Sequence, residues 1–158
     1  ILHEGFGARM MPAPFNAKIV GAKRLGKKNG KGIYEYDAQG RNKKFNPELY
    51  EILGVTPTAG VIASEEIVER CILPMINEAA RCLEEQVVAS ASEVDLGMIM
   101  GTGFPPFRGG LLRYADSLGA KTVVERLKKY QARFGARFEP APTLIARAEH
   151  DQKFYPGA

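Results

Sequence analysis

The side chains that could do acid–base or metal chemistry are scattered along this 158-residue chain. Histidine occurs only as His3 and His150, which are too isolated for a metal pair or a catalytic dyad, so we expect both at the surface or in an interface. Four acids stand on expected helices, where caps and solvated positions explain them better than acid–base catalysis: Glu78, Glu84, Asp95 and Asp116. The residues therefore predict no catalytic group and no metal site.

Two cysteines, Cys71 and Cys82, lie in one expected helix. A helix rises about 1.5 Å per residue, so they stand roughly 16 Å apart along the axis, too far for a disulfide. We expect both to be buried, reduced thiols, which fits a reducing compartment.

The most distinctive segment, residues 101–110, reads Gly-Thr-Gly-Phe-Pro-Pro-Phe-Arg-Gly-Gly. A dinucleotide-binding loop does not fit, because Pro106 takes the third glycine position and a helix, not a strand, is expected before it. A tight interhelical connection fits better, with at least one glycine at positive φ. Phe104 and Phe107 would anchor it on the core, and we expect both to be mostly buried. The residues of this predicted structural loop are Gly101, Gly103, Phe104, Pro105, Pro106, Phe107, Gly109 and Gly110.

Composition is that of an ordinary globular protein, with 45% apolar and 25% charged residues. The length suits one domain, or one domain and the remnant of another. No apolar run approaches the roughly eighteen residues of a membrane span. The first residues lack an initiator methionine and a signal-peptide pattern, so we expect the chain to begin within a longer protein.

The formal net charge is +4, and the basic residues are concentrated in one part of the chain. A solvated surface is the favoured interpretation of this basic segment, and attraction to an anionic substrate or a nucleic acid is the alternative. Its cations are Lys23, Arg24, Lys27, Lys28, Lys31, Arg41, Lys43 and Lys44.

Hydrophobic periodicity predicts an all-α fold. The longest helix begins at Ser64, with apolar residues at four-residue spacing from Ile67 to Leu83, and Pro74 is expected to bend it. Ser92 and Asp95 resemble a capping box that opens another helix. One short extended segment is expected near residues 31–36, and residues 37–44 are a polar loop. The other expected helices lie near residues 1–8, 15–24, 47–53, 111–115, 123–134 and 142–149.

Three segments, taken in order, resemble 3-hydroxyacyl-CoA dehydrogenases. Residues 23–34, Lys-Arg-Leu-Gly-Lys-Lys-Asn-Gly-Lys-Gly-Ile-Tyr, are similar to a recurring signature of that family. The long helix with Asn77-Glu78-Ala79 inside it is the second match. The third and most specific one runs from Asp95 through the 101–110 loop to Tyr114, Asp116 and Gly119 and is similar to the last domain of the multifunctional fatty-acid oxidation α-subunit. With the tail to Pro156, the resemblance covers nearly the whole chain.

The resemblance implies a piece of a larger enzyme. In that family a hydratase region comes first, then an NAD-binding domain with a catalytic histidine and glutamate, then two related helical domains. Residues 1–36 would be the end of the first helical domain, residues 37–45 a linker and residues 46–158 the second helical domain, a helical bundle. No catalytic or cofactor-binding residue is then expected here, since NAD would bind an absent upstream domain.

Two departures from the family pattern concern the site. The first helical domain carries an active-site asparagine before an arginine, and the matching pair here is Glu69-Arg70. An ionised glutamate only accepts hydrogen bonds, so we expect no second active site. A tyrosine that touches substrate in some relatives is replaced by Met100, which remains a candidate for lining the acyl-CoA path.

The implied role is packing, with the tandem helical domains imitating within one chain the dimer of single-function relatives. Implied partners are the absent NAD-binding and hydratase domains, the parent's acyl-CoA substrate and a thiolase subunit. Self-association through residues 1–24 is also expected, and the location would be the cytoplasm in a bacterium, or the mitochondrion or peroxisome in a eukaryote. A helical interaction module that binds an acidic partner through the basic segment is the alternative. A nucleic-acid-binding protein fits less well, because neither a recognition-helix pattern nor interleaved aromatics occur.

Overall fold

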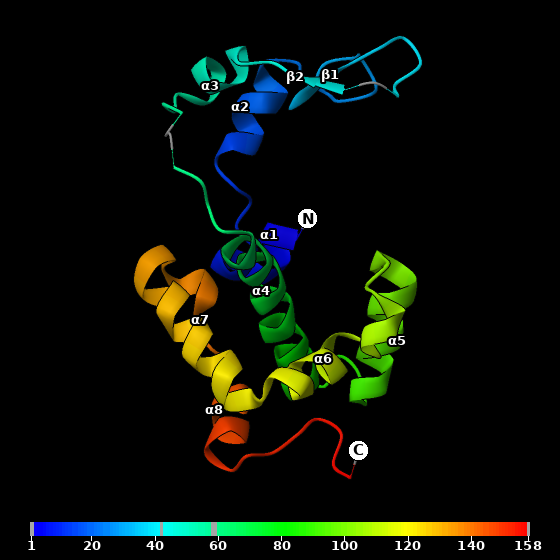
Figure 1. Ribbon diagram of the computed structural model, residues 1–158, viewed down its shortest axis with the longest axis vertical. Helices are drawn as coiled ribbons and strands as arrows, with labels where there is room; N and C mark the ends of the chain where they lie inside the picture. Colours follow the sequence, from blue (N-terminus) through cyan, green and yellow to red (C-terminus); the bar gives the residue numbers. More distant parts are fainter. Residues whose placement is uncertain (1, 42, 58–59, 158) are drawn as a thin grey trace. The chain divides into compact units, whose positions relative to one another are not determined.

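The computed structural model describes residues 2–41, 43–57 and 60–157, and it divides into two compact units, residues 1–61 and 62–158 (Figure 1). This division falls after the segment 37–45, which the sequence interpretation treats as the linker. Part of that segment is strand β2 (Lys43–Phe45), which belongs to the first unit.

The first unit is a set of short elements with little core. It contains α1 (Leu2–Phe6), a 3-10 turn (Gly7–Met10), α2 (Phe15–Gly21), β1 (Tyr34–Tyr36), β2 and α3 (Glu48–Leu53), and α2 packs against α3. Helix α2 ends three residues earlier than expected, because Lys23 has a left-handed backbone (φ 55°) and its N–H bonds to the carbonyl of Val20. Among the described residues of this unit, Leu49 is the one buried apolar side chain.

Strands β1 and β2 form an antiparallel pair in the register Tyr34 to Phe45 and Tyr36 to Lys43. The expected extended segment at 31–36 contains β1, whereas β2 lies where a polar loop was expected. Its three residues, Lys-Lys-Phe, are too few to show an alternating pattern, and the cross-strand partner decides their conformation.

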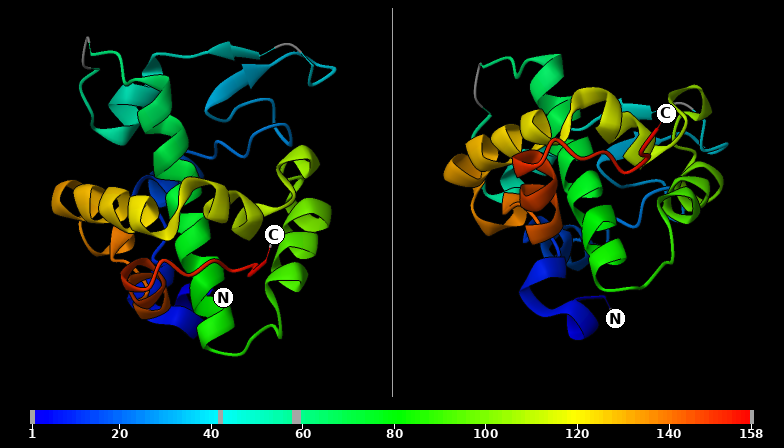
Figure 2. Two further views of the ribbon diagram at one scale, coloured as in Figure 1. Left: turned by 60° about the horizontal axis from the view of Figure 1, so that its bottom comes forward. Right: turned by 90° about the horizontal axis from the view of Figure 1, so that it is seen from below.

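The second unit is a helical bundle around the long helix α4 (Ser64–Glu84) (Figures 1 and 2). It continues with α5 (Ala91–Thr102), a 3-10 turn (Pro106–Arg108), α6 (Leu111–Leu118), α7 (Ala120–Phe134), a 3-10 turn (Ala136–Phe138) and α8 (Pro142–Glu149). Helix α4 contacts α6, α7 and α8, while α5 packs against α6. The all-α prediction is confirmed, since the strands of the described residues amount to one short hairpin. The largest fully buried side chains of the core are Tyr130, Leu73, Ile76, Leu111, Leu112, Leu127, Leu144 and Val123.

A buried amide ties α4 to the start of α8. The Asn77 side chain donates to the carbonyl of Glu139 (2.8 Å) and accepts from the backbone N–H of Ala141 (2.7 Å), so both of its ends are satisfied. A buried polar group costs little when it is fully hydrogen-bonded, which explains an asparagine in the middle of an apolar helix.

Two expectations about α4 and α5 are wrong. Cys71 is exposed and Cys82 is half-buried, because Cys71 lies on the side of α4 that the second unit leaves uncovered, near Ile67. The N-cap of α5 is Ser90 rather than Ser92: the Ser90 hydroxyl accepts from the N–H of Glu93 (3.3 Å). No helix within the described residues is long and apolar enough to cross a membrane.

Candidate functional site

Residues 103–110 form a tight connection between α5 and α6, whereas Gly101 and Thr102 of the predicted loop are the last residues of α5. Gly103, Gly109 and Gly110 have positive φ, and Gly103 closes α5 in the left-handed conformation. Phe104 is 6% exposed and its ring lies 6.4 Å from that of Tyr114. The loop therefore anchors on the core through one phenylalanine.

The prediction that Phe107 is buried is wrong, since its side chain is 82% exposed. Residues 106–108 form a 3-10 turn that begins at Pro106, and this turn directs Phe107 away from the core. The neighbouring Arg108 guanidinium lies 5.7 Å from the Phe107 ring and 5.1 Å from that of Tyr114, so a cationic side chain borders an exposed aromatic one.

Asp95 explains why the loop must end in glycine. Its buried carboxylate accepts from the backbone N–H groups of Leu112 (2.6 Å) and Arg113 (3.1 Å), at the N-terminus of α6, which has no side-chain cap from its own N-cap residue. A carboxylate is favourable there because of the free N–H groups and the helix dipole. A Cβ on Gly110 would lie 2.3 Å from the Asp95 Cβ and Cγ atoms, so a side chain at this position would displace the cap.

Two carboxylates hold the C-terminal tail. Asp116 accepts from the backbone N–H groups of Phe154 (2.8 Å) and Tyr155 (2.9 Å), and Asp95 accepts from the Tyr155 hydroxyl (2.7 Å). Burial, the hydrogen bond to Asp95 and its negative charge raise the pKa of Tyr155 to about 12. These hydrogen bonds attach the tail to Asp116 on α6 and to Asp95 on α5. Sequence reasoning missed Tyr155, because its partner stands 60 residues away.

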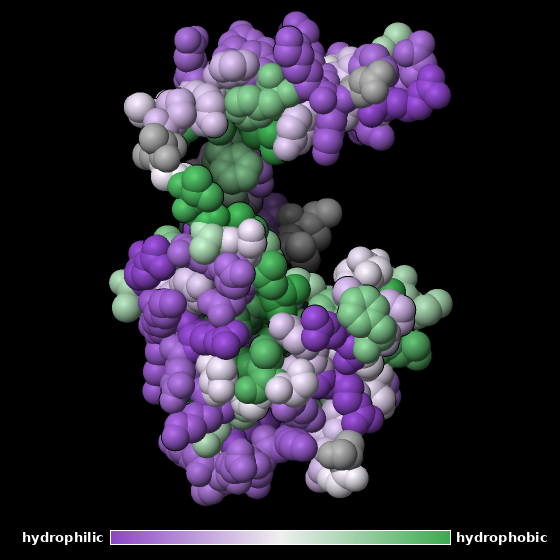
Figure 3. All heavy atoms as spheres, viewed as in Figure 1, coloured by the Kyte–Doolittle hydropathy of each residue, from purple (hydrophilic) through white to green (hydrophobic). Residues whose placement is uncertain are grey.

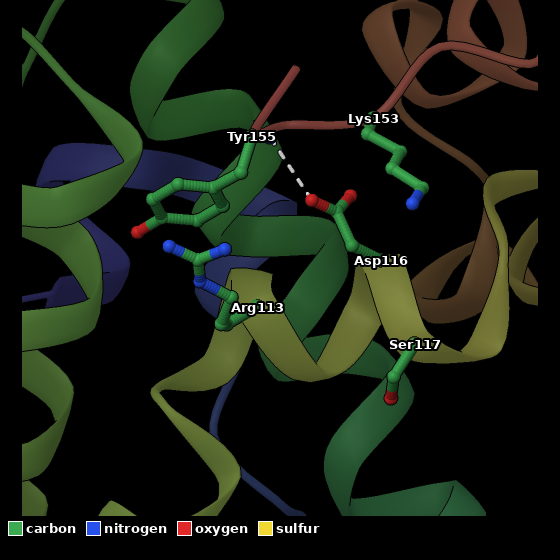
Figure 4. Close-up of a pocket in the computed structure, with 5 residues that line it drawn as sticks. All are labelled: Arg113, Asp116, Ser117, Lys153 and Tyr155. Carbon is green, nitrogen blue, oxygen red and sulfur yellow. Dashed lines mark hydrogen bonds between the residues drawn. The ribbon is translucent and has the colours of Figure 1, made fainter. Parts of the chain in front are cut away.

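A pocket of about 180 Å³ lies beside this tail, lined by Arg113, Asp116, Ser117, Lys153 and Tyr155 (Figure 4). The Arg113 guanidinium stacks 3.9 Å from the Tyr155 ring centroid, and the Ser117 hydroxyl donates to the carbonyl of Tyr114 (2.7 Å). The Asp116 carboxylate accepts from backbone N–H groups of the tail, so both side chains bond to the backbone. The side chains of Arg113 and Asp116 thus attach the tail to α6, and that of Ser117 bonds within α6.

Glu69, which stands where the resemblance places an asparagine, bonds to two side chains of α7. Its carboxylate accepts from the Tyr130 hydroxyl (2.6 Å) and forms an ion pair with Arg126 (2.9 Å). Burial, this hydrogen bond and the negative charge of Glu69 raise the pKa of Tyr130 to about 12. An asparagine would keep the contact to tyrosine and lose the charge that Arg126 pairs with.

The other positions singled out from the sequence do not lie together in one site. Both His3 and His150 are exposed, and Met100 is 78% exposed on α5. Among the described residues, no group of three or more histidine, cysteine or acidic side chains could hold a metal ion. Of the positions singled out from the sequence, the structure brings together Asp95 and Gly110.

Comparisons with known proteins identify the family. The family described as 3-hydroxyacyl-CoA dehydrogenase, C-terminal domain, matches residues 67–154. Two curated relatives are a fatty acid oxidation complex subunit alpha of Shewanella loihica, 49% identical over 158 residues, and one of Shewanella amazonensis, 47% identical over 157 residues. Each alignment covers 98% of this chain.

Solved structures show the same fold. The dehydrogenase part of multifunctional enzyme 1 from C. elegans matches with a TM-score of 0.62 at 24% identity, over 92% of this chain and 34% of that one. FadB2 of M. tuberculosis matches with a TM-score of 0.50 at 22% identity, over 70% of this chain and 40% of that one.

The helical bundle and its capped glycine loop thus belong to a helical fold shared with these solved structures. The chain belongs to the 3-hydroxyacyl-CoA dehydrogenase C-terminal domain family. It spans 22% of the length of the curated relatives it matches.

Proposed function

We propose that this chain is the C-terminal helical part of an NAD-dependent (3S)-3-hydroxyacyl-CoA dehydrogenase of fatty-acid β-oxidation, and that it contributes packing rather than chemistry. The observation that supports the packing role is that three of its acidic side chains bond to groups of the fold. Asp95 and Asp116 cap backbone N–H groups, and Glu69 pairs with α7, so none of the three is available as a general acid or base.

A surface for packing is present on α5 and on the first half of α4. Leu96 is 62% exposed and Met100 78%, and Ile67 and Val68 on α4 are about half exposed. Figure 3 shows hydrophobic side chains gathered over α4 and α5. A helix with apolar residues on nearly all sides is normally buried, and exposed apolar patches mark interfaces.

The occupant of this surface, in our proposal, is the rest of the parent chain. Residues 1–36 would close the first helical domain, residues 37–45 would link the two, and residues 46–158 would form the second, giving an intramolecular pseudo-dimer. Met100 would lie at the edge of the acyl-CoA path. The parent would bind NAD upstream, carry a hydratase region, work with a thiolase subunit and be cytoplasmic in a bacterium.

A domain exchange tests the proposal. This chain would replace the matching 22% of the Shewanella loihica relative, and NAD-dependent oxidation of a 3-hydroxyacyl-CoA would be measured. We expect an active chimera. Met100→Asp, which puts a charge into the proposed interface, should lower the yield of assembled, active enzyme, whereas Ala132→Asp on the exposed side of α7 should leave it unchanged.

The isolated chain provides the other half of the test. We expect it to produce no NADH from a 3-hydroxyacyl-CoA and no heat on titration with NAD. Micromolar binding of NAD, or a chimera as active with Met100→Asp as without it, would contradict the packing role.

A further inference from the structure

Helix α5 lies at the edge of the second unit (Figure 1), where it packs against α6. Its one buried side chain is that of Asp95. Leu96 and Met100 are exposed. A Cβ atom on Gly97 or Gly101 would meet nothing within 4 Å, so these positions also face open space. A helix with so little buried apolar surface should open locally at a lower free energy than the core helices do.

One carboxylate connects α5 to two other segments of the unit. Asp95 caps the N-terminus of α6 by accepting from the N–H groups of Leu112 and Arg113. The same carboxylate accepts from the Tyr155 hydroxyl (2.7 Å). A hydrogen bond to an ionised acceptor is roughly twice as strong as one between neutral groups. The bond to Tyr155 therefore gives α5 a second attachment, separate from its contact with α6.

The tail that carries Tyr155 is also anchored on two other helices. Asp116 on α6 accepts from the N–H groups of Phe154 and Tyr155. The Arg147 guanidinium on α8 donates to the carbonyl of Lys153 (2.8 Å) and lies 4.3 Å from the centre of the Phe154 ring. Figure 2 shows the tail, in red, running from α8 to the side of α5. Because its backbone is held on α6 and α8, the tail presents the Tyr155 hydroxyl to α5 in a defined position.

We propose that residues 151–157 form a strap that holds α5 against the bundle, with the Tyr155 hydroxyl as the group that attaches the strap to α5. When this attachment is lost, α5 opens locally while the core around α4 stays packed. The strap therefore sets how firmly the exposed Leu96 and Met100 are presented to a neighbour. The inference goes beyond the proposed function and does not depend on it, since it concerns contacts within this chain.

Hydrogen exchange of the complete chain tests the strap with two matched substitutions. Tyr155→Phe removes the hydroxyl bonded to Asp95 and keeps the ring beside Arg113, whereas Tyr130→Phe removes a hydroxyl bonded to a carboxylate on α4. We expect Tyr155→Phe to speed the exchange of amides 95–102 about tenfold, because losing a charge-assisted hydrogen bond lowers the free energy of local opening. The amides of α7 should exchange as before. Tyr130→Phe should leave amides 95–102 unchanged.

A shortened chain provides a second variant with the same readout. Deletion of residues 155–158 removes the end of the strap and leaves Phe154, which packs against the core, in place. We expect amides 95–102 to exchange at least as fast as in Tyr155→Phe, while α4 and α7 stay protected.

Two results would overturn the inference. An equal rise of exchange in α5 and α7 after Tyr155→Phe would show that the hydroxyl stabilises the bundle as a whole. Unchanged exchange of α5 in both Tyr155→Phe and the shortened chain would show that α6 alone holds α5. Neither measurement involves NAD or an acyl-CoA, so a failure here leaves the proposed function to be judged by the chimera.

Discussion

At the scale of single residues, the loop of residues 101–110 depends on a few close contacts. Phe104 fills the core, Gly110 leaves room for the Asp95 carboxylate, and Tyr155 donates to the same carboxylate from the tail. Phe104 and Gly110 each have a counterpart that lacks the contact, Phe107 and Gly97, so their contributions to stability can be measured against a control.

The two phenylalanines of the loop form such a pair. Truncating a buried phenylalanine costs about 3–5 kcal/mol through lost transfer energy and a cavity, so Phe104→Ala should lower the melting temperature sharply. Phe107→Ala removes an exposed ring and should change stability by less than about 0.5 kcal/mol, as surface substitutions usually do. Thermal unfolding by circular dichroism compares them, and equal losses would show that Phe107 packs in solution.

Gly110 and Gly97 are predicted to respond with opposite signs. Gly110→Ala would press a methyl group against Asp95 at a φ of 116°, and strain with overpacking should cost about 3 kcal/mol. Gly97 lies inside α5 with nothing within 4 Å of a Cβ, so Gly97→Ala should stabilise the chain by about 0.5–1 kcal/mol. Urea unfolding measures both, and a tolerated Gly110→Ala would mean that Asp95 does not cap α6.

The tyrosine hydroxyls predict how stability changes at alkaline pH. The folded-state pKa of Tyr155 is about 12, above the ordinary value of 10, so the folded state holds this proton more tightly than the unfolded one. The stabilisation is complete below pH 10 and is lost as the pH rises from 10 to 12. Tyr155→Phe should therefore show a shallower loss of melting temperature across this window, and phenolate absorbance should reveal one late-titrating tyrosine fewer. An unchanged slope and titration would exclude the bond to Asp95.

At the scale of elements, local sequence patterns sufficed for the long helices. The apolar repeat of α4, the run that became α7 and the proline that opens α8 predicted elements close to those observed, because each signal lies inside its own helix. Strand β2 and the role of Tyr155 were missed because they depend on contacts between distant segments, whereas Phe107 was missed because of a local turn. The extended conformation of β2 depends on pairing with β1, and the position of Tyr155 depends on its hydrogen bond to Asp95. The 3-10 turn of residues 106–108 directs Phe107 outward.

The start of α5 shows how a choice between two similar local signals can be tested. Ser90 caps the helix by accepting from the N–H of Glu93, and the Glu93 carboxylate accepts from the N–H of Ala89 (3.0 Å). Ser90→Ala should cost about 1 kcal/mol, the usual value of an N-cap, whereas Ser92→Ala should stay within about 0.5 kcal/mol. Denaturant midpoints compare the two variants, and a larger loss for Ser92→Ala would restore the cap expected from the sequence.

At the scale of the whole molecule, the two units differ in how they hold together. The second has a continuous apolar core around α4, whereas the first relies on Leu49 and on hydrogen bonds such as those of Arg24 and Asn29. A unit with so little buried surface gains much from a neighbour.

We predict that the isolated chain associates with itself through exposed apolar side chains near its start. Residues 1–24 expose Phe6, Met11 and Phe15 at about half of their surface, and apolar side chains gathered in one short segment favour contact between copies. We expect sedimentation equilibrium to show a mass above that of the monomer at high concentration. Phe6→Ser/Phe15→Ser should shift the equilibrium towards monomer, whereas Leu25→Ser, equally exposed but outside the segment, should not. If Met100→Ser alone gave a monomer, the exposed apolar surface on α5 would be the contact between copies. A chain that stays strictly monomeric would mean that neither surface is apolar enough to offset the entropy of association.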